Sequence, residues 1–108
     1  MSYDGDITAL MRNPIFNHSP QWEEAKPPHA TSACVGHRRQ LGSNDTELVN
    51  AYGIDAVEIT VLASTLPKAP AKFDKFTVNG QNHIVQDVRQ QIGFGGTVLL
   101  YRAYCKGH

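Results

Sequence analysis

The chain has 108 residues, which fits one domain. Lys plus Arg and Asp plus Glu number 10 each, so the formal net charge is zero and the basic excess of a protein that wraps nucleic acid by itself is missing. No apolar run reaches the roughly 18 residues that span a bilayer. The N-terminus has acidic residues where a secretory signal has basic ones, so we expect synthesis in the cytosol and no membrane contact.

Residues 1–29 are expected to form an irregular N-terminal arm outside the core. Asp6 is placed to cap a short helix through "ITALMR", whose apolar residues share one face, and Asn13-Pro14 ends it. The following "IFNHSPQWEEAKPPH" combines Phe16 and Trp22 with four prolines counted from Pro14. These aromatic residues are expected to dock either onto the chain's own β domain or onto a neighbouring subunit.

Residues 30–108 are expected to form the β domain. "ATSACVGHRR" (30–39) indicates a strand, and the polar, turn-rich stretch 39–53 indicates a long loop, which in so small a domain is usually functional or disordered. "IDAVEITVLA" (54–63) alternates apolar and polar residues and predicts a strand with one apolar and one polar face.

Residues 72–89, "KFDKFTVNGQNHIVQDVR", predict a β-hairpin turning at Asn79-Gly80. His83 and Val85 of the return strand are expected to share a face with Phe76 and Val78, whichever loop length is used. Val88 has the opposite parity, so a bulge near Gln86–Asp87 is expected to re-aim it.

"GFGG" (93–96) predicts a further turn, and "TVLLYRAYC" (97–105) predicts a last strand with apolar residues on both sides. Both faces of such a strand must be covered. The cover is expected from the N-terminal segment or from another subunit. The fold class that follows is mostly β: a small antiparallel β-sandwich or barrel of roughly four to six strands, with an N-terminal arm and one long loop.

No constellation of catalytic, metal-binding or cofactor-binding residues stands out, so we expect the chain not to be an enzyme and to need no cofactor. The five histidines lack metal-type spacing, and His83 is expected to be packed at the mouth of the barrel. His37, Arg38 and Arg39 form a basic cluster, which indicates either a solvated strand end or a contact with an acidic partner or phosphates. Cys34 and Cys105 are expected to be reduced, although a disulfide is left open.

One long segment resembles a known family. "KFDKFTVNGQNHIVQDV", a Gly-rich turn and "TVLLYRA" resemble the C-terminal half of the head–tail joining proteins, the stopper or head-completion connectors, of lambda-like long-tailed bacteriophages. The shared pattern has Asp74, the triplet Phe76–Thr77–Val78, Asn82 in a polar tip and Val88 at the end of an alternating strand. The similarity covers about residues 54–104.

The resemblance implies a structural virion protein: a ring, expected to be hexameric, in the neck between the portal or adaptor complex and the tail terminator or tail tube. Packaged DNA would pass through without sequence-specific binding. The loop 39–53 would line or plug the lumen, with candidates Asn44, Asp45, Glu47, Asn50 and Tyr52. The candidates for contacts with neighbours are Phe16, Trp22, Arg38, Arg39, Leu99, Tyr101 and Arg102.

Two alternatives remain at this point. The first is a tail terminator or completion ring, which the residues do not separate from a stopper. The second is a small barrel that binds single-stranded nucleic acid, for which Tyr101, Tyr104 and Arg102 are the only candidates for a stacking surface with a basic neighbour.

Overall fold

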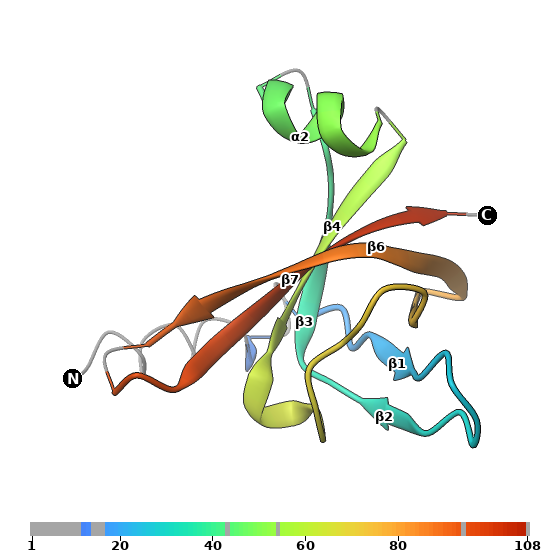
Figure 1. The fold of residues 1–108 in the computed structure, drawn as a ribbon, viewed down its shortest axis with the longest axis vertical. Helices are drawn as coiled ribbons and strands as arrows, with labels where there is room; N and C mark the ends of the chain where they lie inside the picture. Colours follow the sequence, from blue (N-terminus) through green and yellow to red (C-terminus); the bar gives the residue numbers. More distant parts are fainter. Residues whose placement is uncertain (1–11, 14–16, 43, 54, 94, 108) are drawn as a thin grey trace.

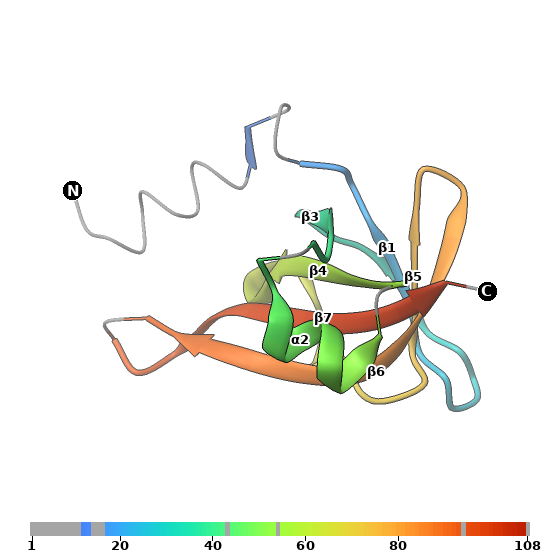
Figure 2. The ribbon, with the colours of Figure 1, turned by 90° about the horizontal axis from the view of Figure 1, so that it is seen from above.

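The computed structural model of the chain describes residues 12–13, 17–42, 44–53, 55–93 and 95–107. Within these residues, seven strands form a single antiparallel sheet that curls into a half-barrel (Figures 1 and 2). The strands are β1 (Gln21–Glu23), β2 (Thr31–Ala33), β3 (Gly36–Gln40), β4 (Ala56–Leu62), β5 (Lys75–Val78), β6 (Gln81–Ile92) and β7 (Val98–Gly107), with a helix α2 (Thr46–Tyr52) and a 3₁₀ turn η1 (Ala63–Thr65).

The strand order across the sheet is β2-β1-β5-β6-β7-β4-β3. The expectation of a mostly β, antiparallel fold of sandwich or barrel type is therefore confirmed. The curled sheet has an inner, concave face that holds the hydrophobic core and an outer, convex face.

Two predictions fall outside the described residues. The first is the short N-terminal helix, of which only Arg12 is described, and the second is the position of Phe16.

The strand β4 follows the predicted alternation. Val57, Ile59 and Val61 lie in the core on the inner face, whereas Glu58 and Thr60 lie on the outer face between the neighbouring strands. Every residue of β4 is nevertheless buried, because β3 and β7 flank it and the outer face carries its own cover.

The predicted hairpin is confirmed with a two-residue turn. Val78 pairs with Gln81, and Asn79 and Gly80 have φ angles of 51° and 80°, the left-handed conformation that a tight hairpin needs. Phe76 pairs with His83 on the inner face, as expected.

The predicted bulge is also present in β6. The register between β6 and β7 shifts between Val85 and Asp87, and Val88 then packs against the core on the inner face. The extra residue in the bulge reverses which side chains of the following part of β6 face inward, so that Val88 points to the core.

The segment that precedes β2 is part of the sheet and not an external arm. β1 lies between β2 and β5, and Trp22 is fully buried in the core. Its indole Nε1 donates a hydrogen bond of 3.0 Å to Oδ2 of Asp74, which is itself only 3% exposed. The backbone N–H groups of Ala71 and Ala25 donate to the two oxygens of the same carboxylate at 2.8 and 2.9 Å.

Two expectations are corrected by this arrangement. Residues 21–23 belong to the β domain, so the boundary at residue 29 does not separate arm from core. Trp22 fills the chain's own interior, so it is not available for contacts between subunits. The sequence did not predict β1 because the strand has only three residues and prolines flank it. Its position follows from pairing with β2 and β5 and not from a pattern of its own.

The expectation of one long loop at 39–53 is also corrected. Arg39 and Gln40 end strand β3, and residues 46–52 form α2, which stands off one end of β3 and β4 (Figure 1). This helix has no buried residue and no side-chain cap, so its own sequence gave little indication of it.

Both faces of the last strand are covered by the same chain. On the inner face Tyr101, Ala103 and Cys105 belong to the core that contains Trp22. On the outer face Leu100 packs with Leu62 in a second, smaller cluster. The two-sided apolar character of β7 therefore gives no reason to require a neighbouring subunit.

We predict that Asp74→Asn lowers the free energy of unfolding by about 1–3 kcal/mol, because at least one of the three N–H groups that donate to this buried carboxylate loses its acceptor. Urea denaturation measures the change. Asp55→Asn, which neutralises an exposed carboxylate, is the matched control and should change stability by less than about 0.5 kcal/mol. Equal stabilities of the two variants would contradict the role given to Asp74.

Candidate functional site

Two groups of side chains are candidates for function: an outer-face cluster that holds α2, and a pocket at the mouth of the half-barrel. The outer-face cluster consists of Arg39, Asp45, Tyr52, Glu58, Asp87 and Tyr104. Arg39 Nη1 lies 3.0 Å from Asp45 Oδ2 and Arg39 Nε lies 3.4 Å from Glu58 Oε1. The guanidinium therefore bridges the start of the helix to the outer face of β4.

The C-terminal end of α2 is held by an aromatic contact. The rings of Tyr52 and Tyr104 stack with centroids 4.9 Å apart and planes 4° from parallel. The Tyr52 hydroxyl donates a hydrogen bond to Asp87 Oδ2, and the Arg89 guanidinium lies 5.4 Å from the centre of the Tyr104 ring. Tyr104 is thus covered by the helix and by β6, and is only 3% exposed.

These contacts shift the titration of the residues involved. The hydrogen bond from Arg39 lowers the pKa of Asp45, and the hydrogen bond from Tyr52 lowers the pKa of Asp87. The same bond to Asp87 raises the pKa of Tyr52, while burial raises the pKa of Tyr104. At neutral pH Asp45 and Asp87 are therefore ionised, and Tyr52 and Tyr104 are neutral.

The five lumen candidates divide into two groups. Asp45 and Tyr52 are engaged in anchoring the helix. Asn44, Glu47 and Asn50 are exposed to solvent. The segment 41–56 contains no Lys or Arg, so the exposed charge on α2 is the carboxylate of Glu47.

The interface candidates are scattered. Tyr101 is buried in the core, Leu99 is half-buried beside the smaller cluster, and Arg102 Nη2 donates to Gln91 Oε1 at 2.6 Å. Arg39 belongs to the outer-face cluster, and Arg38 lines the mouth pocket. The structure does not bring the described candidates to one surface, and even the neighbours Arg38 and Arg39 point to opposite faces of β3.

The stacking surface proposed for single-stranded nucleic acid is corrected by burial. Tyr101 and Tyr104 are 9% and 3% exposed, and they lie on opposite faces of β7. Bases cannot stack on rings that are covered by other side chains. The structure thus removes the observation on which this alternative rested.

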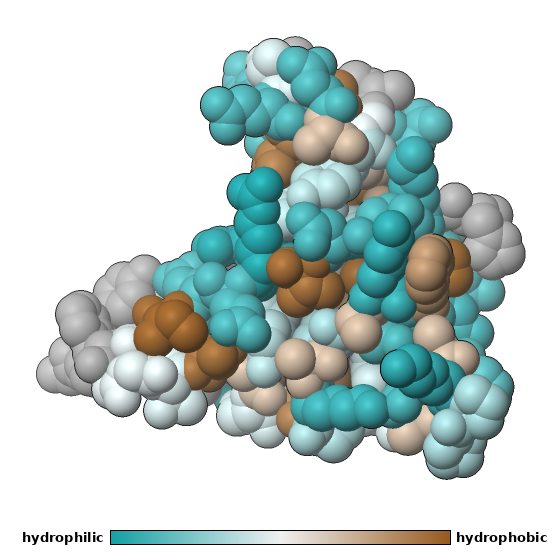
Figure 3. Space-filling view, in the orientation of Figure 1, coloured by the Kyte–Doolittle hydropathy of each residue, from teal (hydrophilic) through white to brown (hydrophobic). Residues whose placement is uncertain are grey.

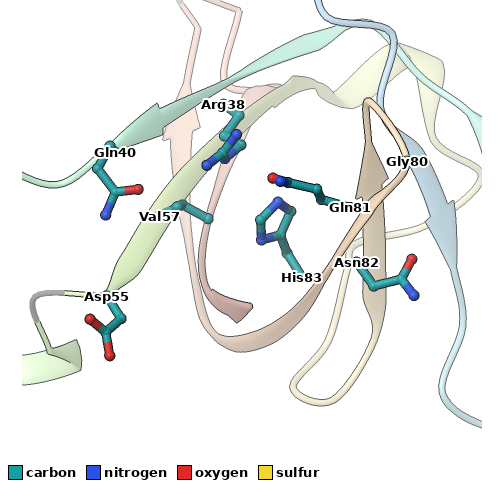
Figure 4. A pocket seen from close by; sticks show the side chains of 8 residues that line it. All are labelled: Arg38, Gln40, Asp55, Val57, Gly80, Gln81, Asn82 and His83. Atoms are coloured by element: carbon teal, nitrogen blue, oxygen red, sulfur yellow. The ribbon is translucent and has the colours of Figure 1, made fainter. Parts of the chain in front are cut away.

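The mouth pocket is a cavity of about 440 Å³ between the C-terminal end of β3 and the tip of the β5–β6 hairpin. Figure 4 shows Arg38, Gln81 and His83 converging from these two elements, while Asp55 lies further away at the rim. The residues that line it are Arg38, Gln40, Asp55, Val57, Gly80, Gln81, Asn82 and His83.

His83 lies at the barrel mouth, as expected, and is only 4% exposed. Burial and the nearby charge of Arg38 lower its pKa, so the imidazole is neutral at pH 7. The sequence predicted His83 at the barrel mouth and Arg38 in a basic cluster at a strand end, but it gave no sign that they face one another. That proximity arises from the curl of the sheet, which brings the start of the middle strand β6 towards the edge strand β3 although β7 and β4 lie between them in the strand order.

Neither cysteine is an activated nucleophile. Both are free thiols, as expected, and burial raises the pKa of each to about 12. The Sγ of Cys34 donates to the carbonyl oxygen of Pro20 at 3.1 Å. Among the described residues, no three His, Cys, Asp or Glu side chains gather as metal ligands.

No protein-family model matches the chain, and no curated protein or solved structure is detectably similar to it. The described part of the chain has no helix long and apolar enough to cross a membrane. The resemblance to connector proteins therefore stays a prediction from the sequence.

We predict that acid releases α2 before the sheet unfolds. Asp45 and Asp87 have lowered pKa values in the folded state, so their contribution is present above the ordinary carboxyl pKa and is lost as the pH falls through the lowered values. The ring resonances of Tyr52 should be constant from pH 7 to 5 and move towards solvent-exposed values below about pH 4.

Asp87→Asn keeps an acceptor for Tyr52 without titrating, and it should weaken this response. Tyr52 resonances that stay unchanged down to pH 2 while the sheet is folded would contradict the anchoring role of the two carboxylates.

We also predict that both thiols are inert in the folded protein. With a pKa of about 12 for each, the thiolate fraction at pH 8 is very small. Reaction with an aromatic disulfide reagent should therefore be slower than for an exposed thiol by a factor on the order of a thousand. In urea both thiols should react. A thiol that reacts at the exposed rate without urea, or no free thiol in urea, would refute this assignment.

Proposed function

We propose that the chain is a structural subunit of a head–tail connector ring of stopper type in a long-tailed bacteriophage, placed in the neck of the virion and not acting as an enzyme. The sequence resemblance over residues 54–104 supports the proposal. It is also supported by one structural observation: the second half of β6 has an open edge on a projecting hairpin.

The open edge begins where β5 ends. β5 pairs with β6 only as far as Ile84, and the loop before β5 adds hydrogen bonds to Val85. From Gln86 to Ile92 no described strand lies on that side of β6, although β7 continues to pair on the other side. A strand edge that no described strand covers is a common place for a strand from another chain to pair.

The same region projects from the body of the sheet. β4 pairs with β7 only up to Leu100, so the end of the β6–β7 hairpin extends beyond the other described strands as a two-stranded ribbon (Figures 1 and 2). Ile92 near its end is 52% exposed, and Figure 3 shows hydrophobic surface there. A two-stranded ribbon is marginally stable alone and an exposed apolar end favours contact with a partner.

The helix α2 replaces the predicted loop as the element that would face the lumen. It stands off the other end of the sheet from the hairpin ribbon (Figure 1), and its exposed Glu47 with the amides of Asn44 and Asn50 would not attract phosphates. DNA could then pass without adhering. The head-side partner would be a portal or adaptor ring and the tail-side partner a terminator or tail tube. A tail-terminator ring would use the same edge, and the residues of this chain do not distinguish a terminator from a stopper.

We predict that Ile92→Asp weakens assembly while leaving the monomer folded. Ring formation on portal or adaptor complexes is followed by light scattering and negative-stain imaging. Burying an isoleucine is worth about 1.5–3 kcal/mol, so the charged variant should require at least about tenfold more protein to assemble.

Phe73→Asp is the matched control. Phe73 is 62% exposed, but it lies in the loop before β5, away from the ribbon. It should assemble like the unchanged protein. Assembly of the Ile92 variant at normal concentrations, or a protein that never joins such complexes, would count against the proposal.

A further inference from the structure

We propose that the mouth pocket binds a small acidic ligand, with its carboxylate or phosphate group held between Arg38, His83 and Gln81. The proposal concerns each single subunit and does not depend on the connector function.

The first support is an arginine without an anion. Arg38 pairs with Ile59 across the sheet, which directs its side chain to the inner face. Its Nε is buried and has no hydrogen-bond partner, and no carboxylate of the described residues forms an ion pair with it. The adjacent Arg39, on the outer face, has two acidic partners. A partly buried guanidinium is costly unless an anion pairs with it, and it is suited to oxyanions through its parallel N–H groups.

The second support is a buried histidine whose two ring nitrogens are both without a partner. His83 is 4% exposed, and Nδ1 and Nε2 are buried and unbonded. Buried polar side chains in folded proteins are bonded in the large majority of cases. The neutral ring has one N–H donor, which an oxygen of the ligand would accept, and the remaining nitrogen accepts from a hydroxyl or water.

The third support is the form of the pocket. About 440 Å³ lies within the range of roughly 300–1,000 Å³ that is common for small-molecule sites and exceeds what one inorganic ion fills. Gln81 supplies an amide beside the Arg38–His83 pair, and Asp55 lies away from it at the rim (Figure 4). The charges thus direct the acidic end of a ligand inward and its neutral or cationic end outward.

The test is a titration of the isotope-labelled protein followed by NMR, with inorganic phosphate in one arm and acetate in the other. Ionic strength is kept constant with sodium chloride. We expect saturable shifts of the amides of Gly80, Gln81 and His83 and of the Arg38 Nε–H resonance. Saturation by phosphate only, or by acetate only, identifies which acidic group the site takes.

Arg38→Gln should weaken binding at least about tenfold, since a hydrogen bond to a charged group contributes roughly 1.5–3 kcal/mol. Arg89→Gln is the control, because it removes the same charge from an exposed position on β6. His83→Phe keeps a ring but removes both nitrogens, and it should also weaken binding. This second variant maintains the test if Arg38→Gln does not fold.

Three results would overturn the proposal. The first is the absence of saturable shifts with either anion. The second is equal weakening by Arg38→Gln and Arg89→Gln, which would indicate a general charge effect. The third is undiminished binding by His83→Phe.

Discussion

The buried pair of Trp22 and Asp74 is the interaction on which the rest of the structure depends. It joins β1 to the segment that leads into β5, two parts of the chain separated by 52 residues. Asp74 also accepts hydrogen bonds from Ala71 and Ala25, so a single carboxylate satisfies donors from two segments without regular structure. A buried charge is tolerated here because it is bonded on both oxygens.

This pair determines where the other features lie. With β1 fixed beside β5, the sheet curls enough for Trp22 to close the core beneath the hairpin, and the hairpin tip approaches the end of β3 to form the mouth pocket. Asp74 is also part of the sequence pattern from which the resemblance to connector proteins is predicted. In this chain the residue acts as a structural acceptor, and its position just before the β5–β6 hairpin suits that role.

The parts of the fold that were predictable are those defined by local pattern. The alternation in β4, the Asn79-Gly80 turn and the reversed parity of Val88 each belong to one short segment, and each prediction was correct. β1 and α2 were missed because both are defined by distant partners: Trp22 by Asp74, and Tyr52 by Tyr104 and Asp87. The pocket was missed for the same reason, since Arg38 and His83 are 45 positions apart and meet only once the sheet has curled.

The completed core changes the argument for assembly. Oligomerisation is not needed to cover β7, so any ring must be built from surfaces that are already folded in the monomer. The β6 edge from Gln86 onward and the apolar end of its ribbon are such surfaces, while α2, held by the outer-face cluster, lies apart from them. In the proposed ring, the subunit can stay monomeric until it meets a preceding ring, because the core of the described residues is already covered within one chain.

The most direct test of this account is an electron cryomicroscopy reconstruction of the chain assembled with the portal and adaptor complexes. The account predicts a closed ring of folded half-barrels in which the β6 edge of each copy contacts its neighbour and α2 faces the axis. A protein that stays monomeric in the presence of these complexes, or a ring in which the β6 edge is exposed to solvent, would contradict it.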